Sequence, residues 1–376
     1  MSEPAVVHVI AGLGLGGAEH TLLRLLESVH TTFPSSVVTL GRDGPLSERI
    51  RDLGVRVVPL DASGAGSMAA RAPRLVSLLR DARPAVVQTW MYHADVIGGM
   101  AARLARAGPV VWNVRTTDLD PATEKRTTRA IVRVAAALSR RVPDRIVCNS
   151  HAARRAHVRL GYPDALLEVI PNGVAITPGR TDDAASLRAG VGLRPDDVVV
   201  GRIGRIAPVK GQLQLVDAIG RLAPTRPALR LVLCGLGADA SNSSLVDRIE
   251  RAGISDRTVL LGPRADVERI HAMLDVACSP SIEEGFPNAV AEAMAAGVPV
   301  CATDVGDSSL IVGDCGIIVA PGDIEALAIG VAKLVDLESG ALRALGERAR
   351  ARIVGTFDVE TMAAAYADLW TGLARR

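Results

Sequence analysis

Short apolar runs alternate with longer amphipathic stretches along the whole chain. Runs such as Val6–Ile10 and Val198–Ile203 are continuous and rich in valine and isoleucine, as expected for strands that are buried on both faces of a sheet. Between them lie stretches of helical period, for example 18–29, whose leucines fall on one side. Strands separated by helices of this length pair in parallel, so the pattern predicts an α/β protein with doubly wound sheets.

The alternation occurs twice, on either side of the turn-rich stretch 171–179. Predicted strands are 6–10, 36–40, 55–59, 85–88, 110–114, 146–149 and 168–170 in the first series, and 198–203, 229–234, 259–261, 276–279, 298–302 and 316–319 in the second. Predicted helices of the second series are 211–222, 243–252, 266–273, 288–296 and 323–336, and an amphipathic helix follows at 359–374. We therefore expect an N-terminal Rossmann-like domain over 1–175, a second over 176–357, and a C-terminal helix over 358–376 that packs back on the first domain.

Composition agrees with two globular domains. The chain has 376 residues, 48% hydrophobic and 22% charged, which is enough for two buried cores. Its five cysteines form no C-x-x-C pair and lie mostly in apolar runs, so they are expected to be reduced and buried. No basic segment precedes the first apolar run, and no run approaches the roughly 18 apolar residues of a membrane span. These features predict a cytoplasmic protein.

Charge is distributed unevenly. The first 180 residues carry a net charge of +8 and the remainder −6, and thirteen basic residues fall between Arg103 and Arg159. A basic half predicts peripheral contact with anionic lipid at the inner face of a membrane, and an anionic substrate or nucleic acid would fit as well. Solvated helix faces in an arginine-rich chain explain the same counts. Among 43 basic residues only Lys125, Lys210 and Lys333 are lysines, which draws attention to a lysine in a glycine-rich loop.

Two glutamates, Glu284 and Glu292, have seven residues between them and follow an apolar run that ends at Ser279. Pro287 and Asn288 are expected to open a helix, because proline is tolerated in a first turn and asparagine caps free N–H groups. The helix start suits an anion, and carboxylates accept hydrogen bonds from hydroxyl groups. The pattern fits a polyhydroxylated phosphate ester, and an ordinary capped helix with solvated glutamates fits it equally.

A second loop, 201–211, follows the first strand of the second series. Arg205 and Lys210 bracket a tight turn in it that opens a helix. Two cations at a helix start would neutralise a diphosphate, which is how a phosphate leaving group is stabilised. Two surface cations at a loop are the alternative interpretation. Since this loop and the glutamate segment follow strands of one predicted sheet, we expect them at the same edge.

Three further segments of the first half carry candidate chemistry. Gly12-Leu-Gly-Leu-Gly-Gly17 matches G-x-G-x-x-G, the loop in which backbone approaches a phosphate, with Asp43 as a loose match for the acidic residue of a dinucleotide site. His93 follows a strand end and starts a helix, so it is expected at the cleft, although a lone histidine usually has a structural role. Asp118-Leu-Asp120 resembles a metal-binding aspartate pair but lacks supporting ligands, so no metal site is predicted.

Taken together, these segments resemble glycosyltransferase family 4, the retaining nucleotide-sugar enzymes of the GT-B fold, in which two Rossmann-like domains face a central cleft. The resemblance covers nearly the whole chain, and the stretch Trp90-Met-Tyr-His-Ala-Asp95 looks most like members that build bacterial polysaccharides and lipopolysaccharide. It implies site residues in three groups. The catalytic group is His93, Arg205, Lys210 and Glu284; the donor-binding group is Gly16, Gly17, Arg264, Gly285, Phe286, Pro287, Asn288 and Glu292; and the acceptor-binding group is Tyr92 and Arg115.

The resemblance implies transfer of a sugar from a nucleoside diphosphate sugar, of UDP or GDP type, to a hydroxyl acceptor with the anomeric configuration kept. It implies a same-face mechanism in which Arg205 and Lys210 stabilise the diphosphate, without a metal or other cofactor and without nucleic acid. Three other functions compete: an NAD-dependent dehydrogenase, another GT-B enzyme such as a nucleotide-sugar epimerase, and a non-catalytic scaffold on membrane or nucleic acid.

Overall fold

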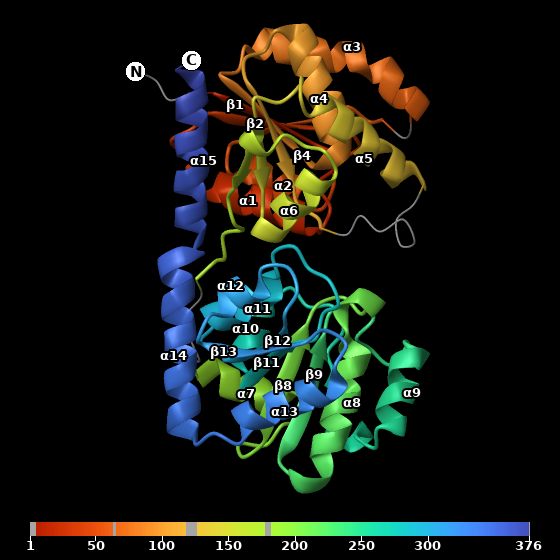
Figure 1. Ribbon diagram of the computed structural model, residues 1–376, viewed down its shortest axis with the longest axis vertical. Helices are drawn as coiled ribbons and strands as arrows, with labels where there is room; N and C mark the ends of the chain where they lie inside the picture. Colours follow the sequence, from red (N-terminus) through yellow and green to blue (C-terminus); the bar gives the residue numbers. More distant parts are fainter. Residues whose placement is uncertain (1–4, 63–64, 118–125, 177–181, 376) are drawn as a thin grey trace. The chain divides into compact units, whose positions relative to one another are not determined.

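A computed structural model describes residues 5–62, 65–117, 126–176 and 182–375 (Figure 1). The chain divides into two compact units, one made of Met1–Gly173 with Val359–Arg376 and the other of Val174–Asp358. Each unit is built on a parallel sheet, of seven strands in the first and six in the second, with helices on both faces. The predicted fold class, two doubly wound α/β domains, is confirmed.

The sheet of the first unit has the strand order β3-β2-β1-β4-β5-β6-β7, and every pairing is parallel. Its strands are β1 (Val6–Ile10), β2 (Ser35–Thr39), β3 (Arg56–Pro59), β4 (Val86–Trp90), β5 (Val110–Val114), β6 (Arg145–Cys148) and β7 (Leu167–Val169). The order reverses between β1 and β4, because β2 and β3 lie on one side of β1 and the later strands on the other. This reversal is the topological switch point at which doubly wound folds bind ligands.

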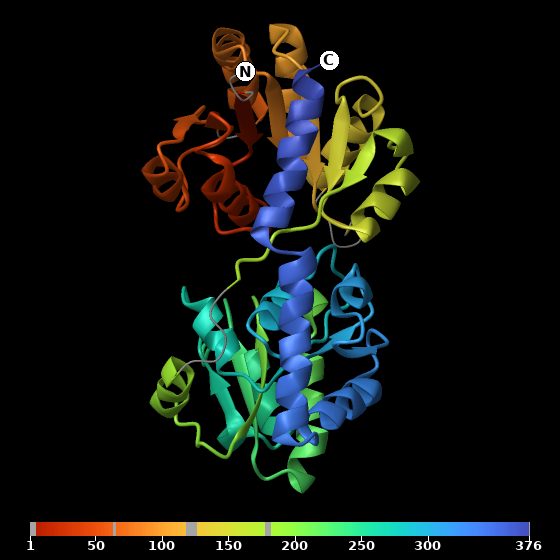
Figure 2. The ribbon, with the colours of Figure 1, turned by 90° about the vertical axis from the view of Figure 1, so that its left-hand side faces the viewer.

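Helices cover both faces of this sheet. One core holds side chains of α3 (Ala65–Ala82), α4 (Met91–Ala105), α5 (Arg126–Leu138) and α6 (His151–Arg159). The opposite core holds side chains of α1 (Gly17–Val29), α2 (Ser47–Asp52) and the last helix, α15 (Val359–Ala374). Figure 2 shows α15 lying across its face of the sheet. Trp370 of α15 is fully buried there and donates from Nε1 to Oε1 of Gln88 at 3.0 Å.

The second unit repeats the plan with strand order β10-β9-β8-β11-β12-β13 and a switch point between β8 and β11. Its strands are β8 (Val198–Ile203), β9 (Leu229–Cys234), β10 (Thr258–Leu260), β11 (Val276–Ser279), β12 (Val300–Thr303) and β13 (Gly316–Val319). Its helices are α7 (Asp182–Gly190), α8 (Gln212–Leu222), α9 (Ser243–Arg251), α10 (Val267–Ala272), α11 (Asn288–Ala295), α12 (Ser308–Val312), α13 (Ile324–Val335) and α14 (Ser339–Thr356).

Helix α14 is the largest element that the sequence pattern did not predict. Only Gly346, Ala349 and Ile353 of its residues are buried, so it lacks the broad apolar stripe that marks a helix in a sequence. Gly346 explains how it packs, because a Cβ atom there would clash with the backbone oxygen of Gly297 at the end of α11. The helix therefore packs by close backbone approach at Gly346 together with the narrow stripe of Ala349 and Ile353.

Candidate active site

The switch point of the second unit brings the two predicted loops together. The loop after β8 carries Arg205 and Lys210, the loop after β11 carries Glu284, and β8 and β11 are neighbours in the sheet. The backbone N–H of Ile282 donates to the carbonyl of Val209 at 2.8 Å, which ties one loop to the other. The sequence predicted that these loops share an edge, and the strand order shows why: the reversal places their strands side by side.

Glycine at position 211 makes this approach feasible. Gly211 ends the short 3-10 turn Pro208–Lys210 with φ of +69°, a conformation that favours glycine. A Cβ atom there would also clash with the backbone oxygen of Pro280, in the loop after β11. The turn therefore lies directly against the glutamate loop, and Lys210 is presented to it.

Lys210 and Glu284 form the central contact of the site. Nζ of Lys210 lies 2.8 Å from both Oε1 and Oε2 of Glu284, and Ser281 donates from its hydroxyl to Oε1 at 2.8 Å. The Glu284 side chain is only 11% exposed and that of Lys210 24%, so the pair is largely shielded from water. Arg205 is exposed on the same loop. One carboxylate and two cations thus occupy the carboxyl ends of β8 and β11.

The second glutamate lies one turn inside α11. Its Oε2 is 4.0 Å from Nε2 of His271 on α10, and burial lowers the pKa of His271 to about 4, with the charge of Glu292 opposing that shift. The N-cap of α11 is Pro287, which makes no side-chain cap bond, and Asn288 is the first helical residue, not the cap that the sequence analysis expected. Phe286 is buried against Phe357, so only its backbone faces the loop.

The switch point of the first unit holds the other predicted residues. Gly16 is the N-cap of α1 and follows β1, with Gly17 as the first helical residue. His93 is exposed in the first turn of α4, which begins directly after β4. Met91, between β4 and His93, has φ of +70°, a strained value for a side chain of its size that makes the chain turn sharply from strand into helix.

Two family models match this chain over these regions. The model described as Glycosyltransferase Family 4 matches residues 15–177, and the model described as Glycosyl transferases group 1 matches residues 197–336. The first includes Gly16, Gly17 and His93, and the second includes Arg205, Lys210, Glu284 and Glu292. The chain therefore carries a family 4 glycosyltransferase domain followed by a group 1 glycosyl transferase domain.

Solved structures agree with this assignment. HepE from Anabaena, solved in complex with UDP, superposes with a TM-score of 0.86 at 25% identity, over 98% of this chain and 100% of that one. The same protein in complex with UDP-glucose gives a TM-score of 0.84. The fold of this glycosyltransferase is therefore GT-B, as the resemblance implied.

Curated relatives match a smaller share of the chain. D-inositol 3-phosphate glycosyltransferase from Mycobacterium marinum is 30% identical over 225 residues, covering 58% of this chain and 47% of the relative. The lipopolysaccharide core biosynthesis mannosyltransferase LpsB from Rhizobium meliloti is 33% identical over 200 residues, covering 51% and 57%. The chain spans about half the length of the curated relatives it matches.

The family match leaves the dehydrogenase interpretation without support. That interpretation required Asp43 to bind a ribose, whereas Asp43 is paired with Arg51 through contacts of 2.7 and 2.8 Å. Arg264, a predicted donor residue of the glycosyltransferase, lies after β10 and is exposed, with its guanidinium bonded to Asp266 at 2.7 and 2.8 Å. Its predicted role is not tested by this contact.

Tyr92 and Arg115, for which an acceptor role is predicted, both take part in contacts within the first unit. Tyr92 is 4% exposed, and its hydroxyl lies 2.8 Å from Nε2 of His157 in the core of the first unit. Arg115 bonds Asn113, Thr21 and Asn172, and its guanidinium lies 5.4 Å from the ring centre of Trp90. Burial lowers the pKa of Arg115, which is typical of a cation held inside the fold. Both side chains hold the first sheet together in this structure.

Sequence reasoning missed Arg202, which is part of the same charged cluster. It lies in β8, is 4% exposed, and approaches Oε1 of Glu284 to 3.7 Å. The signal was present, because an arginine inside an otherwise apolar strand that is buried on both faces needs a specific partner. His271 gave no comparable signal, since a single histidine on a short helix has many ordinary explanations.

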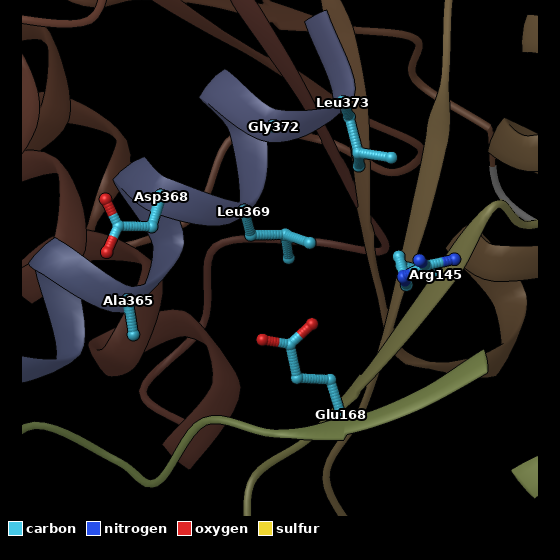
Figure 3. Close-up of a pocket in the computed structure, with 7 residues that line it drawn as sticks. All are labelled: Arg145, Glu168, Ala365, Asp368, Leu369, Gly372 and Leu373. Atoms are coloured by element: carbon cyan, nitrogen blue, oxygen red, sulfur yellow. The ribbon is translucent and has the colours of Figure 1, made fainter. Parts of the chain in front are cut away.

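The first unit also contains a cavity. A cavity of about 360 Å³ in the first unit is lined by Arg145, Glu168 and the α15 residues Asp368 and Leu369, with Gly372, Ala365 and Leu373 (Figure 3). Among the described residues, no group of three or more His, Cys, Asp or Glu side chains is placed to hold a metal ion. Asp118 and Asp120 lie outside the described residues. No helix in the described part of the chain is long and apolar enough to span a membrane.

Proposed function

We propose that this protein transfers a sugar from a nucleoside diphosphate sugar to a hydroxyl acceptor with retention of configuration. The observation that carries the proposal is the Lys210–Glu284 contact at the switch point of the second unit. A cation and a carboxylate held together at a helix start suit a donor that is anionic at one end and polyhydroxylated at the other.

The reaction that we propose is the same-face transfer that the resemblance to family 4 implies. The bond between the anomeric carbon and the β-phosphate oxygen breaks, and the acceptor oxygen bonds the same face of that carbon. The acceptor proton passes to the departing phosphate. Lys210, Arg205 and the N-terminus of α11 stabilise the charge that develops on the diphosphate. Glu284 and Glu292 accept hydrogen bonds from hydroxyl groups of the sugar and the ribose, and His93 of the first unit contacts the transferred sugar. We propose that this chemistry needs no metal.

The donor is proposed to be of UDP or GDP type. HepE, which superposes over nearly the whole chain, was solved with UDP and with UDP-glucose, which favours UDP. A curated relative is named a mannosyltransferase. The acceptor is proposed to be a hydroxyl group of a glycan, a lipid-linked sugar or a small molecule.

Calorimetric titration with UDP, GDP and NAD tests the proposal. We expect one nucleoside diphosphate to bind and Lys210→Ala to weaken its binding about 10- to 100-fold, because a hydrogen bond to a charged group contributes about 1.5–3 kcal/mol. Lys333→Ala is the matched control, since Lys333 is an exposed lysine in the last turn of α13. With the donor identified by a hydrolysis screen, His93→Ala should lose turnover and keep diphosphate affinity. Binding of NAD and of neither diphosphate would contradict the proposal.

We also propose that the first unit contacts an anionic membrane. Helices α4 and α5 expose Met100, Leu104 and Val134, with Leu104 68% exposed. Exposed arginines of these helices and of the segment after α5 lie near them in sequence: Arg103, Arg106, Arg133, Arg140 and Arg141. Apolar side chains among arginines are the composition of a surface that inserts shallowly between anionic headgroups.

A further inference from the structure

Arg202 is the most buried charge of the donor site. It lies in β8, one residue before the strand ends at Ile203, and its side chain is 3% exposed. Nη1 donates to the carbonyl of Ile203 at 3.0 Å and Nη2 to the hydroxyl of Ser281 at 3.3 Å, while Nε has no hydrogen-bond partner in the described part of the chain. Burial lowers the pKa of Arg202, and the charges of Glu284, Cys278 and Glu292 oppose that shift.

A buried, incompletely bonded arginine is costly, so its position calls for a reason. Its guanidinium lies 3.7 Å from Oε1 of Glu284, the same oxygen that accepts from Ser281 and Lys210. Ser281, itself fully buried, contacts both Arg202 and Glu284. Among the described contacts, this carboxylate therefore meets an accessible cation from the loop and a buried one from the strand.

The two cations differ in what they are able to do. Lys210 lies at the end of a 3-10 turn, its side chain is 24% exposed, and its Nζ lies 2.8 Å from both carboxylate oxygens of Glu284. A diphosphate at this helix start presents several oxygens and more negative charge than one carboxylate, so it competes for Lys210. Arg202 is anchored in the sheet and enclosed, so it cannot follow.

We propose that Arg202 is a positioning residue that keeps Glu284 ionised and oriented when Lys210 transfers to the diphosphate of the donor. This inference rests on the proposed function. Donor binding is then an exchange of partners: Lys210 goes from carboxylate to phosphate, while Glu284 stays with Arg202 and Ser281 and accepts a hydrogen bond from a sugar hydroxyl. Without Arg202, the departure of Lys210 would leave the Glu284 carboxylate with two cations fewer beside a diphosphate, which favours uptake of a proton.

Proton uptake on UDP binding tests the exchange, or on GDP binding if that is the nucleotide that binds. Binding enthalpies at pH 7.5 in buffers of different ionisation enthalpy give the protons taken up, and subtracting the wild-type value removes the contribution of the nucleotide itself. We expect Arg202→Gln to bind UDP with an additional uptake of about half a proton or more. Arg202→Lys, which keeps the charge, should restore the wild-type value.

Two variants identify the group that takes up the proton. The charges of Glu292 and His271 also act on or respond to Arg202, so we expect the extra uptake to vanish in Arg202→Gln combined with Glu284→Gln. Arg188→Gln is the matched control: Arg188 is 9% exposed and pairs with Asp275 at 2.8 Å in the same unit, and its loss should change stability without changing proton uptake.

Each outcome bears on one proposal. If Arg202→Gln takes up no more protons than the wild type on binding UDP, the exchange is overturned and the proposed function is not. The same holds if the additional uptake persists in the double variant. Failure of the wild type to bind UDP or GDP overturns the proposed function, and the exchange with it. If Arg202→Gln does not fold, Glu284→Gln decides: we expect UDP affinity to rise about 3- to 10-fold, because Lys210 no longer has to leave a carboxylate, and unchanged or weaker affinity overturns the exchange.

Discussion

Asp95 is a fully buried carboxyl group in α4, two residues after His93. Its Oδ1 accepts hydrogen bonds from the Thr89 hydroxyl at 2.6 Å and the Asn113 N–H at 3.4 Å, and Oδ2 has no partner in the described part of the chain. Burial raises the pKa of Asp95 to about 7, although both hydrogen bonds lower it. The folded protein therefore holds a proton on Asp95 over a pH range in which the unfolded chain has released it.

We expect Asp95→Asn to stabilise the protein at pH 8 and to change little at pH 5. Between pH 4 and 7 the folded state binds one proton more than the unfolded state at this site, so the contribution of Asp95 to stability falls as pH rises. The full shift corresponds to about 4 kcal/mol, of which we expect about 1–3 kcal/mol to be recovered because asparagine keeps the Oδ1 acceptor. Urea unfolding of both proteins at pH 5 and pH 8 measures this difference in the free energy of unfolding. Asp95→Ala, which loses the acceptor, is the control and should destabilise at both values.

Contacts between candidate site residues could be predicted from the sequence only where the order of strands and loops places those residues at one edge of a sheet. Glu284 and Lys210 lie in loops whose strands turned out to be neighbours, so the contact between them follows from the fold pattern. Whether Tyr92 or Arg115 faces solvent depends on which side of a helix or strand end it occupies and on partners such as His157 and Asn172, which are distant in sequence. Local pattern contains no information on those partners.

Helices α4 and α5 expose apolar side chains close to arginines. Leu104 is 68% exposed near Arg103 and Arg106, so its side chain gains burial only against another surface. We expect the protein to float with vesicles that contain anionic phospholipid, and Leu104→Gln to reduce the bound fraction several-fold, since fully burying a leucine contributes about 1.5–3 kcal/mol. Leu310→Gln, which replaces an exposed leucine of the second unit, is the control. Equal binding to neutral vesicles would contradict an electrostatic contribution.

The bounds of strands were predicted well where the sequence has a continuous apolar run. A helix was missed where few apolar side chains are buried and backbone approach at a glycine makes the contact. Strands Val6–Ile10, Val110–Val114 and Leu229–Cys234 have the predicted bounds, because buried parallel strands read as continuous apolar runs. Helix α14 was missed because its buried stripe is narrow and Gly346 supplies the contact. Most other strand limits differ by one or two residues, as expected where the hydrogen-bond ladder and not residue type ends an element.

At the scale of the whole molecule, each unit repeats one plan: a parallel sheet whose order reverses once, with candidate residues after the two central strands. The sequence predicted this plan because alternation of strands and helices admits few topologies. The sequence pattern does not determine which side chains in the loops of the first unit reach solvent, because the packing of each loop decides that. The two units also share buried histidines, which predict a sensitivity to acid in each.

Both units bury neutral histidines. Burial lowers the pKa of His8 to about 3 and of His157 to about 4 in the first unit, and of His271 to about 4 in the second. The unfolded chain protonates these side chains near pH 6.5, so below that pH it binds more protons than the folded state and stability falls as pH falls. At pH 5 the difference of about 1.5 pH units corresponds to about 2 kcal/mol for each histidine.

We therefore expect both units to lose thermal stability between pH 7 and pH 5, which scanning calorimetry would show as lower transition temperatures at pH 5. His157→Gln and His271→Gln should each reduce the acid sensitivity of its own unit and leave that of the other unchanged, because each histidine is buried within one unit. His93→Gln is the control, since His93 is exposed and its replacement removes no buried imidazole. Transition temperatures that stay constant from pH 7 to pH 5 would show that these histidines are accessible to protons in the folded state. If either substitution reduced the acid sensitivity of both units equally, the two units would unfold as one.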